Sequence, residues 1–171
     1  MMKDLEPFVF TVFEIESLQT IKEVIEERYK ERFNMGKAEF VQEPFNLKNF
    51  YNPSSSASKD DVFVFWKEKK YENRILFTSN SSDGRFTLCN RLSKILSCNY
   101  FMCRMLLETE EIYPFFEIRY KRYGIEEERC VQAYKDPKWT FFEKGEPLDF
   151  EDLELYKKKY IRDRLNSDII I

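Results

Sequence analysis

YFMCRMLLETEEIYPFFEIRYKRYGIEEERCVQAYKDPKWTFFE, residues 100–143, contains four apolar and aromatic runs separated by polar links of hairpin length. The runs cover residues 100–107, 115–123, 129–135 and 139–143. In the second run, Phe116 and Ile118 alternate with charged residues such as Glu117, which is the period of a strand with one apolar and one charged face. Because parallel strands need long crossovers, strands that follow one another so closely predict an antiparallel sheet. We expect the last run to form an edge strand.

The chain before residue 100 adds three predicted strands and two predicted helices. The strands are FVFTVFEI (8–15), DVFVFWK (61–67) and RILFTS (74–79), and the last two are expected to form a hairpin. Ser17 is a good N-cap for an amphipathic helix over about 17–33, where apolar residues recur at helical spacing. A similar spacing predicts a short helix over about 86–97.

After residue 143 the chain is predicted to turn and form a last helix. In KWTFFEKGEPLDFEDLELYKKKYIRDRLN, residues 138–166, Pro147 ends regular structure and Asp149 or Asp152 can cap the helix. Aromatic and apolar residues are expected to bury against the sheet, namely Trp139, Phe141, Leu153, Tyr156 and Tyr160. Lys157, Lys158 and Arg162 are expected to be solvated. The order of acids before bases complements the helix dipole, so the basic run has a structural explanation.

These elements predict one α+β domain over residues 1–171. We expect a mostly antiparallel sheet of about five to seven strands, with about three helices packed mainly on one face. The stretch PSSSASKDD, residues 53–61, has low complexity. A long connection of this kind in a domain is often a mobile loop, which we place at residues 52–61.

Composition excludes several mechanisms. The chain has no histidine, which excludes Ser-His-Asp and Cys-His catalysis and Cys/His zinc sites. The four cysteines (Cys89, Cys98, Cys103 and Cys130) form no CxxC pair, and the four glycines lie far apart, so no Gly-rich nucleotide motif exists. We expect buried, reduced thiols, no cofactor and no metal. We expect neither a signal peptide nor a membrane span, which favours a cytoplasmic protein.

The charge of the chain favours a protein partner over nucleic acid. The formal net charge is −3, and residues 1–60 contain 11 acidic and 8 basic residues against 20 of each in the remainder. Nucleic-acid proteins that neutralise phosphates usually have a basic balance. The acidic residues we select as candidates for binding a basic partner are Asp60, Asp61, Glu126, Glu127 and Glu128.

Two stretches together resemble small cytoplasmic bacterial proteins thought to act as immunity partners of polymorphic toxins. They are SSDGRFTLCNRLSKILSCNYFMCRM (81–105) and the chain from Arg129 to Ile171, with its Trp-aromatic strand and G-x-P-L-x-F-E turn. The matching residues are Asp83, Gly84, Trp139, Gly145, Pro147, Phe150 and Glu151, all interpreted as scaffold. The resemblance implies a single-domain α+β protein that binds a protein without a cofactor. Together with the acidic candidates above, it makes a basic toxin domain the expected partner. It transfers no functional residue.

Two other functions stay open at this point. An RNA- or single-strand-binding module would use the aromatic and basic strand 115–123 with the basic face of the last helix. A histidine-free carboxylate hydrolase would need two facing carboxylates from the pairs Glu110–Glu111, Glu126–Glu128 or Glu151–Asp152. Adjacent acids more often lie in solvated turns or at helix starts.

Overall fold

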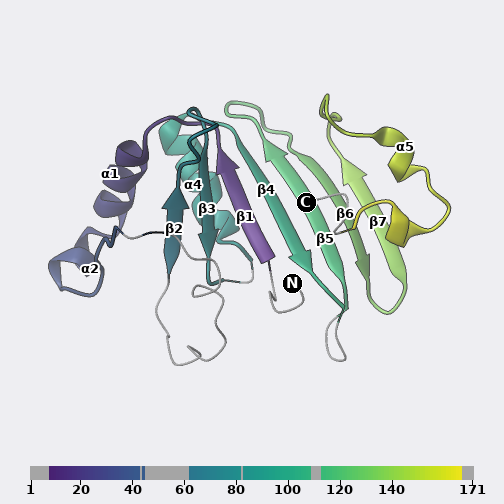
Figure 1. Cartoon of the computed structure of the whole chain (residues 1–171), viewed down its shortest axis with the longest axis horizontal. Helices are drawn as coiled ribbons and strands as arrows, with labels where there is room; N and C mark the ends of the chain where they lie inside the picture. The colour runs from purple at the N-terminus through teal and green to yellow at the C-terminus, as the bar shows by residue number, and fades with distance from the viewer. Residues whose placement is uncertain (1–7, 43, 45–61, 82, 109–112, 167–171) are drawn as a thin grey trace.

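Seven antiparallel strands form one sheet in the computed structural model, which describes residues 8–42, 44, 62–81, 83–108 and 113–166 (Figure 1). The strands are β1 Phe8–Phe13, β2 Phe63–Trp66, β3 Ile75–Ser79, β4 Tyr100–Leu106, β5 Phe115–Lys121, β6 Arg129–Lys135 and β7 Trp139–Lys144. Their order is β2-β3-β1-β4-β5-β6-β7. The α+β class, all seven predicted strands, the β2–β3 hairpin and the edge position of β7 are confirmed.

The helices follow the predicted starts more closely than the predicted ends. They are α1 Leu18–Arg28, α2 Lys30–Asn34, α4 Phe86–Leu96 and α5 Leu153–Tyr156, with a 3₁₀ helix, η2, at Ile161–Asp163. Ser17 caps α1 as predicted, since its Oγ accepts a hydrogen bond from the Thr20 N–H at 3.1 Å. The helix expected over 17–33 is divided at Tyr29, whose backbone leaves the helical region while its ring packs against Phe63. None of the helices among these residues has the length and apolarity needed to cross a membrane.

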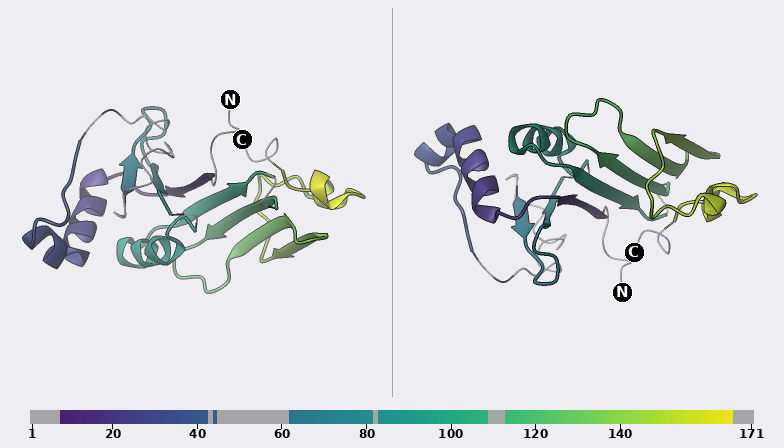
Figure 2. Two further views of the ribbon diagram at one scale, coloured as in Figure 1. Left: turned by 90° about the horizontal axis from the view of Figure 1, so that it is seen from below. Right: turned by 90° about the horizontal axis from the view of Figure 1, so that it is seen from above.

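Two hydrophobic clusters lie on opposite faces of the sheet, and β4 contributes to both. Tyr100 and Met102 belong to the first cluster, with α1 and α4, whereas Cys103 and Met105 point the other way into the second. Figure 2 accordingly shows α4 and α5 on opposite sides of the sheet. The expectation of a sheet covered mainly on one face is therefore wrong, because the covering elements change face along the sheet.

The first cluster fills the space between α1, α4 and the strands β3, β1 and β4. Its buried members are Val9, Phe13, Ile21, Ile25, Ile75, Phe77, Leu88, Cys89, Leu92, Cys98, Tyr100 and Met102. The second cluster lies between β4–β6 and the segment after β7. Its buried members are Cys103, Met105, Phe116, Ile118, Val131, Ala133, Tyr156 and Leu165. As expected, all four cysteines are free and buried.

The expectation of one long last helix is wrong. Of its predicted core face, Tyr156 is buried, but Leu153 is 41% and Tyr160 55% exposed. The chain leaves the helix after Tyr156 and returns through η2, which places Leu165 in the second cluster. Tertiary burial of Leu165 thus overrides the helical spacing. Trp139 and Phe141 were expected to be buried and are only half-buried. Lys157, Lys158 and Arg162 are exposed, as predicted.

Arg129 attaches the segment after β7 to the sheet. Its guanidinium donates to both carboxylate oxygens of Glu151, at 2.7 to 3.1 Å, and to the carbonyls of Lys144 and Gly145. Glu151 also accepts hydrogen bonds from the Leu148 N–H (2.9 Å) and the Tyr156 hydroxyl (3.0 Å). The side chains of Arg129 and Glu151 are 3% and 1% exposed, so this is a buried, fully bonded ion pair.

Most residues that carry the family resemblance have structural contacts. The Asp83 carboxylate accepts hydrogen bonds from the Ser81 hydroxyl and the Arg85 N–H. Gly84 leaves room for Val9, whose Cγ1 would lie 2.2 Å from an added Cβ. Phe150 is different, because it is 71% exposed and its ring contacts Phe101 edge to face, so its interpretation as scaffold stays a prediction.

Replacing Gly145 with alanine should destabilise the fold more than replacing Gly124. Both residues have positive φ, +79° and +75°, but an added Cβ at 145 would lie 2.4 Å from the Glu128 backbone oxygen, whereas at 124 no atom of a described residue lies within 4 Å. Backbone strain predicts about 1 kcal/mol for Gly124→Ala, and strain plus overlap about 2–4 kcal/mol for Gly145→Ala. Urea melts measure both values. Equal losses would contradict the close approach of the β7 turn to Glu128.

The contribution of Glu151 to stability should disappear in acid. Burial alone would raise the pKa of its carboxyl, but hydrogen bonds from Arg129, the Leu148 N–H and Tyr156 outweigh it and hold the pKa below its ordinary value. A carboxyl with a lowered pKa in the folded state stabilises the fold above its unfolded pKa of about 4.3 and loses that contribution as the pH falls. At pH 7 the free energy of unfolding of the wild-type chain should therefore exceed that of Glu151→Gln by about 3 kcal/mol. The gap should narrow steadily below about pH 4 in urea melts, and a gap that widens in acid would refute this assignment.

Candidate functional site

One half of one sheet face has no described helix over it. It comprises the side chains of β4–β7 that point to the same side as α4 but lie beyond that helix, and we call it the open face. Its residues are Arg104, Leu106, Phe115, Glu117, Arg119, Lys121, Cys130, Gln132, Tyr134, Thr140, Phe142 and Lys144. At its border with α4, the Arg119 guanidinium lies over the Phe86 ring, 4.9 Å from the centroid.

The strand register arranges the open face in rows that run across the sheet. One row is Leu106, Phe115, Tyr134 and Thr140, the next is Arg104, Glu117, Gln132 and Phe142, and the third continues through Arg119, Cys130 and Lys144. Polar groups therefore occupy the middle of the face, and aromatic rings border them. Phe142 is 44% exposed, so part of this aromatic surface is in contact with solvent.

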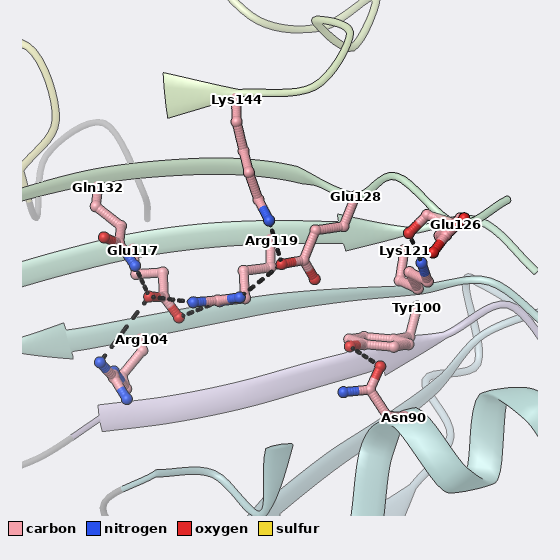
Figure 3. A network of polar contacts seen from close by, with 10 residues as sticks. All are labelled: Asn90, Tyr100, Arg104, Glu117, Arg119, Lys121, Glu126, Glu128, Gln132 and Lys144. Atoms are coloured by element: carbon pink, nitrogen blue, oxygen red, sulfur yellow. Dashed lines mark hydrogen bonds and ion pairs between the residues drawn. The ribbon is translucent and has the colours of Figure 1, made fainter. Parts of the chain in front are cut away.

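Glu117 lies at the centre of the polar rows (Figure 3). Its side chain is only 3% exposed. It accepts hydrogen bonds from Arg119 Nε at 2.7 Å, from Arg119 Nη2 at 3.2 Å and from Gln132 Nε2. Arg104 Nη2 lies 3.9 Å from Glu117 Oε2. A single buried carboxylate thus orients side chains from three neighbouring strands, β4, β5 and β6.

Arg119 connects Glu117 to a second carboxylate. Its Nη1 donates to Glu128 Oε1 at 2.8 Å, and Lys144 Nζ lies 3.1 Å from the same oxygen (Figure 3). Burial alone would lower the pKa of Arg119, but the hydrogen bond and charge of Glu117, with the charge of Glu128, raise it above its ordinary value. The guanidinium is therefore a fixed positive charge whose donors are already directed at protein acceptors.

Arg104 is held differently. Its guanidinium carbon lies 4.2 Å from the centroid of the Phe115 ring, and Phe115 in turn stacks on Tyr134 with ring centroids 6.0 Å apart. The Arg104 side chain is 26% exposed, while its Nε is buried and has no hydrogen-bond partner among the described residues. Arg104 is thus ordered by stacking, and in the part of the chain that the structure describes its one ion pair is the long 3.9 Å approach to Glu117.

The acidic candidate residues differ in their surroundings, and two of them are not described. Asp60 and Asp61, with the loop predicted at 52–61, lie outside the described residues. Glu126 and Glu127 are exposed in the link between β5 and β6. Glu128 is only 15% exposed and is bonded to Arg119 and Lys144, so it belongs to the scaffold of the open face rather than to a free acidic patch.

The described carboxylates considered for hydrolysis have structural partners, except those exposed on the link between β5 and β6. Glu151 is bound by Arg129, and Asp152 caps α5 by accepting from the Glu154 N–H at 3.1 Å. Glu110–Glu111 lies outside the described residues. Within the part of the chain that the structure describes, no group of three or more His, Cys, Asp or Glu residues could hold a metal ion. Burial raises the pKa of the Cys98 and Cys130 thiols to about 11.

Sequence reasoning missed the roles of Arg104, Glu117 and Gln132. The alternation in 115–121 placed Glu117 and Arg119 on the same face, which was the available signal. Their neighbours on β4 and β6 depend on register, which the local pattern does not specify.

Comparisons with known proteins do not narrow the function of this site. No protein-family model, curated protein or solved structure matches the chain. The geometry of the open face and the chemistry of its residues are therefore the basis for the proposals below.

Glu117→Gln should destabilise the fold by about 3 kcal/mol, because removing one member of a buried ion cluster leaves buried charges without compensation. The substitution keeps the size of the side chain but removes the negative charge that Arg119 and Arg104 share. Glu127→Gln is the matched control, since Glu127 is exposed on the adjoining link and should change stability by under about 0.5 kcal/mol. Urea melts of both variants measure the effect. Similar values for the two would show that Glu117 does not organise the open face.

Proposed function

We propose that this chain is a non-enzymatic protein-binding module and that it acts in the cytoplasm of a bacterium as an immunity protein, masking a cognate toxin. The resemblance of residues 81–105 and 129–171 to such proteins supports this proposal, and so does the lack of histidine. The observation that carries it is the open face, where ordered arginines and partly exposed aromatic rings lie side by side.

The composition of the open face is that of a protein-binding surface. Arginine, tyrosine and tryptophan dominate the residues that contribute most to protein interfaces, and they act from ordered, partly desolvated positions. Arg104 on Phe115, with Tyr134 beside it, supplies such a group, and Glu117 fixes the arginines before a partner arrives. Preorganised side chains lose less conformational freedom on binding, which favours affinity.

The exposed acids define a second zone of the proposed interface. Glu126 and Glu127 lie on the link between β5 and β6, next to the open face. We propose that these two residues, with Asp60 and Asp61, attract a basic surface of the toxin and increase the association rate. Glu128 is not included as a free acid, because it is bonded to Arg119 and Lys144.

Single-stranded nucleic acid is the alternative ligand that this face favours next. Aromatic rings beside arginines can stack bases. However, Glu117 and Glu128 already compensate Arg119 and Lys144, and the basic helix that would have completed the surface does not form. A protein partner therefore fits the charges better than a polyanion does.

The proposal is tested with the protein encoded by the gene next to that of this chain. Co-expression of the full chain should restore the growth of bacteria that produce this neighbouring protein, and the two purified proteins should bind. Lys157→Ala with Lys158→Ala should leave binding unchanged, since these exposed residues belong to the covered side of the sheet. Glu126→Lys with Glu127→Lys should slow association by roughly tenfold at low salt.

Failure to restore growth, together with no binding in calorimetry, would overturn the immunity proposal. Salt-sensitive binding of a uridine decanucleotide in a filter assay, with no binding of the neighbouring protein, would instead favour the nucleic-acid alternative.

A further inference from the structure

We infer that the open face docks an acidic segment of its protein partner, with a partner carboxylate paired to Arg104 and an adjoining apolar side chain on Phe115, Tyr134 and Phe142. This inference rests on the proposed protein-binding function and specifies the chemistry of the partner surface. The face would thus accept negative charge, while the acidic link at Glu126–Glu127 attracts positive charge.

The open face has the opposite charge balance to the whole chain. Its basic residues are Arg104, Arg119, Lys121 and Lys144. The only acids of its network in the described residues are Glu117 and Glu128. The face therefore carries excess positive charge, although the formal net charge of the chain is −3. An acidic surface complements it, and a basic one would be repelled.

The excess charge lies on Arg104 and Lys121, because Arg119 and Lys144 pair with Glu117 and Glu128, and of these two cations Arg104 is the one stacked on the Phe115 ring. Arg119 is bonded to Glu117 and Glu128, Lys144 pairs with Glu128, and Lys121 Nζ donates to the Glu126 carbonyl (Figure 3). Glu117 is closest to Arg119, at 2.7 Å, and lies 3.9 Å from Arg104. One carboxylate cannot fully compensate two guanidinium groups, and the group it approaches less closely is Arg104.

Stacking prepares Arg104 for a carboxylate. A guanidinium that lies over an aromatic ring is held at its face, and its terminal N–H groups stay available at its edge, where a carboxylate binds with two parallel hydrogen bonds. The Phe115 ring holds Arg104 in this way, with Tyr134 behind it. Because Nε is buried, without an acceptor in the described ranges, the partner carboxylate would meet the terminal Nη atoms.

The surroundings of Arg104 favour an isolated carboxylate over a nucleic-acid strand. Phe142, exposed by 44%, ends the row that contains Arg104, with buried Glu117 and half-buried Gln132 between them, so a ligand on this row meets one cation, an amide and then an aromatic ring. A strand of phosphates would extend past the exposed Glu126 and Glu127 and would be repelled there. In a partner segment with an acidic residue beside an apolar one, the carboxylate would pair with Arg104 and the apolar side chain would contact Phe142.

Arg104→Leu tests the pairing, because leucine removes the charge and keeps apolar bulk next to Phe115. Binding of the protein encoded by the neighbouring gene, measured by calorimetry with the full chain, should weaken by roughly 10- to 100-fold, the usual effect of losing a charge-assisted hydrogen bond. Arg162→Leu is the matched control, since this arginine is 66% exposed and lies in η2 on the covered side of the sheet. It should change the dissociation constant by less than about twofold.

A second measurement separates the docking chemistry from the identity of the partner. The ¹⁵N-labelled full chain is titrated with the peptide acetyl-Glu-Leu-Glu-Leu-Glu-amide, with its lysine counterpart and with a uridine decanucleotide. The acidic peptide should shift the amide signals of Arg104, Phe115 and Gln132 in the wild-type chain, and Arg104→Leu should abolish these shifts. Thermal melts of Arg104→Leu verify that the variant is folded.

The outcomes are distinguishable. If the neighbouring protein binds the wild-type chain and Arg104→Leu equally well, the inference is wrong and the immunity function stands. If the neighbouring protein does not bind but the acidic peptide shifts the open face, the immunity function falls and the docking chemistry stands. Preferential binding of the lysine peptide or of the decanucleotide at the open face would overturn the inference.

Discussion

The strict alternation of side chains along β4 is the constraint on which the rest of the structure depends. Tyr100 and Met102 point toward α1 and α4, whereas Cys103 and Met105 point toward the segment after β7. Because each residue can face only one side, covering elements on both sides of β4 produce two separate cores. The same alternation directs Arg104 to the α4 side beyond the reach of that helix, which creates the open face.

A buried ion cluster lies on each face of the sheet formed by β5, β6 and β7. One cluster attaches a covering segment, and the other lies on the open face. On the covered side, Arg129 binds Glu151 and fixes the turn after β7 and Tyr156 to the sheet. On the open side, Glu117 binds Arg119 and Gln132 without any covering segment among the described residues. Buried ion pairs contribute more to a defined geometry than to net stability in some proteins. Here the first pair closes a core, and we propose that the second presents a binding surface.

The sequence allowed the strands to be predicted because alternation and β-branched or aromatic runs are local properties. Phe116 and Ile118 alternate with Glu117 wherever the strand is placed, and Ser17 caps α1 through contacts within four residues. The central place of β1, between β3 and β4, depends on long-range pairing and was not predicted. The last helix was predicted at the wrong length, because the spacing of Leu153, Tyr156 and Tyr160 does not reveal that Leu165 is the residue that is buried.

The candidate site was harder to predict from the sequence, because it too depends on long-range strand pairing. The acids were selected by their number and position, yet Glu128 is neutralised by Arg119 across the sheet, a contact that only the β5–β6 pairing reveals. Arg104 lies outside the acidic and basic runs that attract notice, and its importance comes from its neighbours Phe115 and Glu117. A site built from register has no contiguous motif in the sequence.

Hydroxyl-radical footprinting of the full chain, alone and with the protein encoded by the neighbouring gene, tests most directly whether the open face is the binding surface. Oxidation of a side chain reports its access to solvent. On the open face, Phe142 and Tyr134 should be protected in the mixture, while Phe150 and Tyr160, exposed by 71% and 55%, should be oxidised as in the free chain. Protection of Phe150 and Tyr160 with unchanged oxidation of Phe142 and Tyr134 would contradict this assignment of the binding surface.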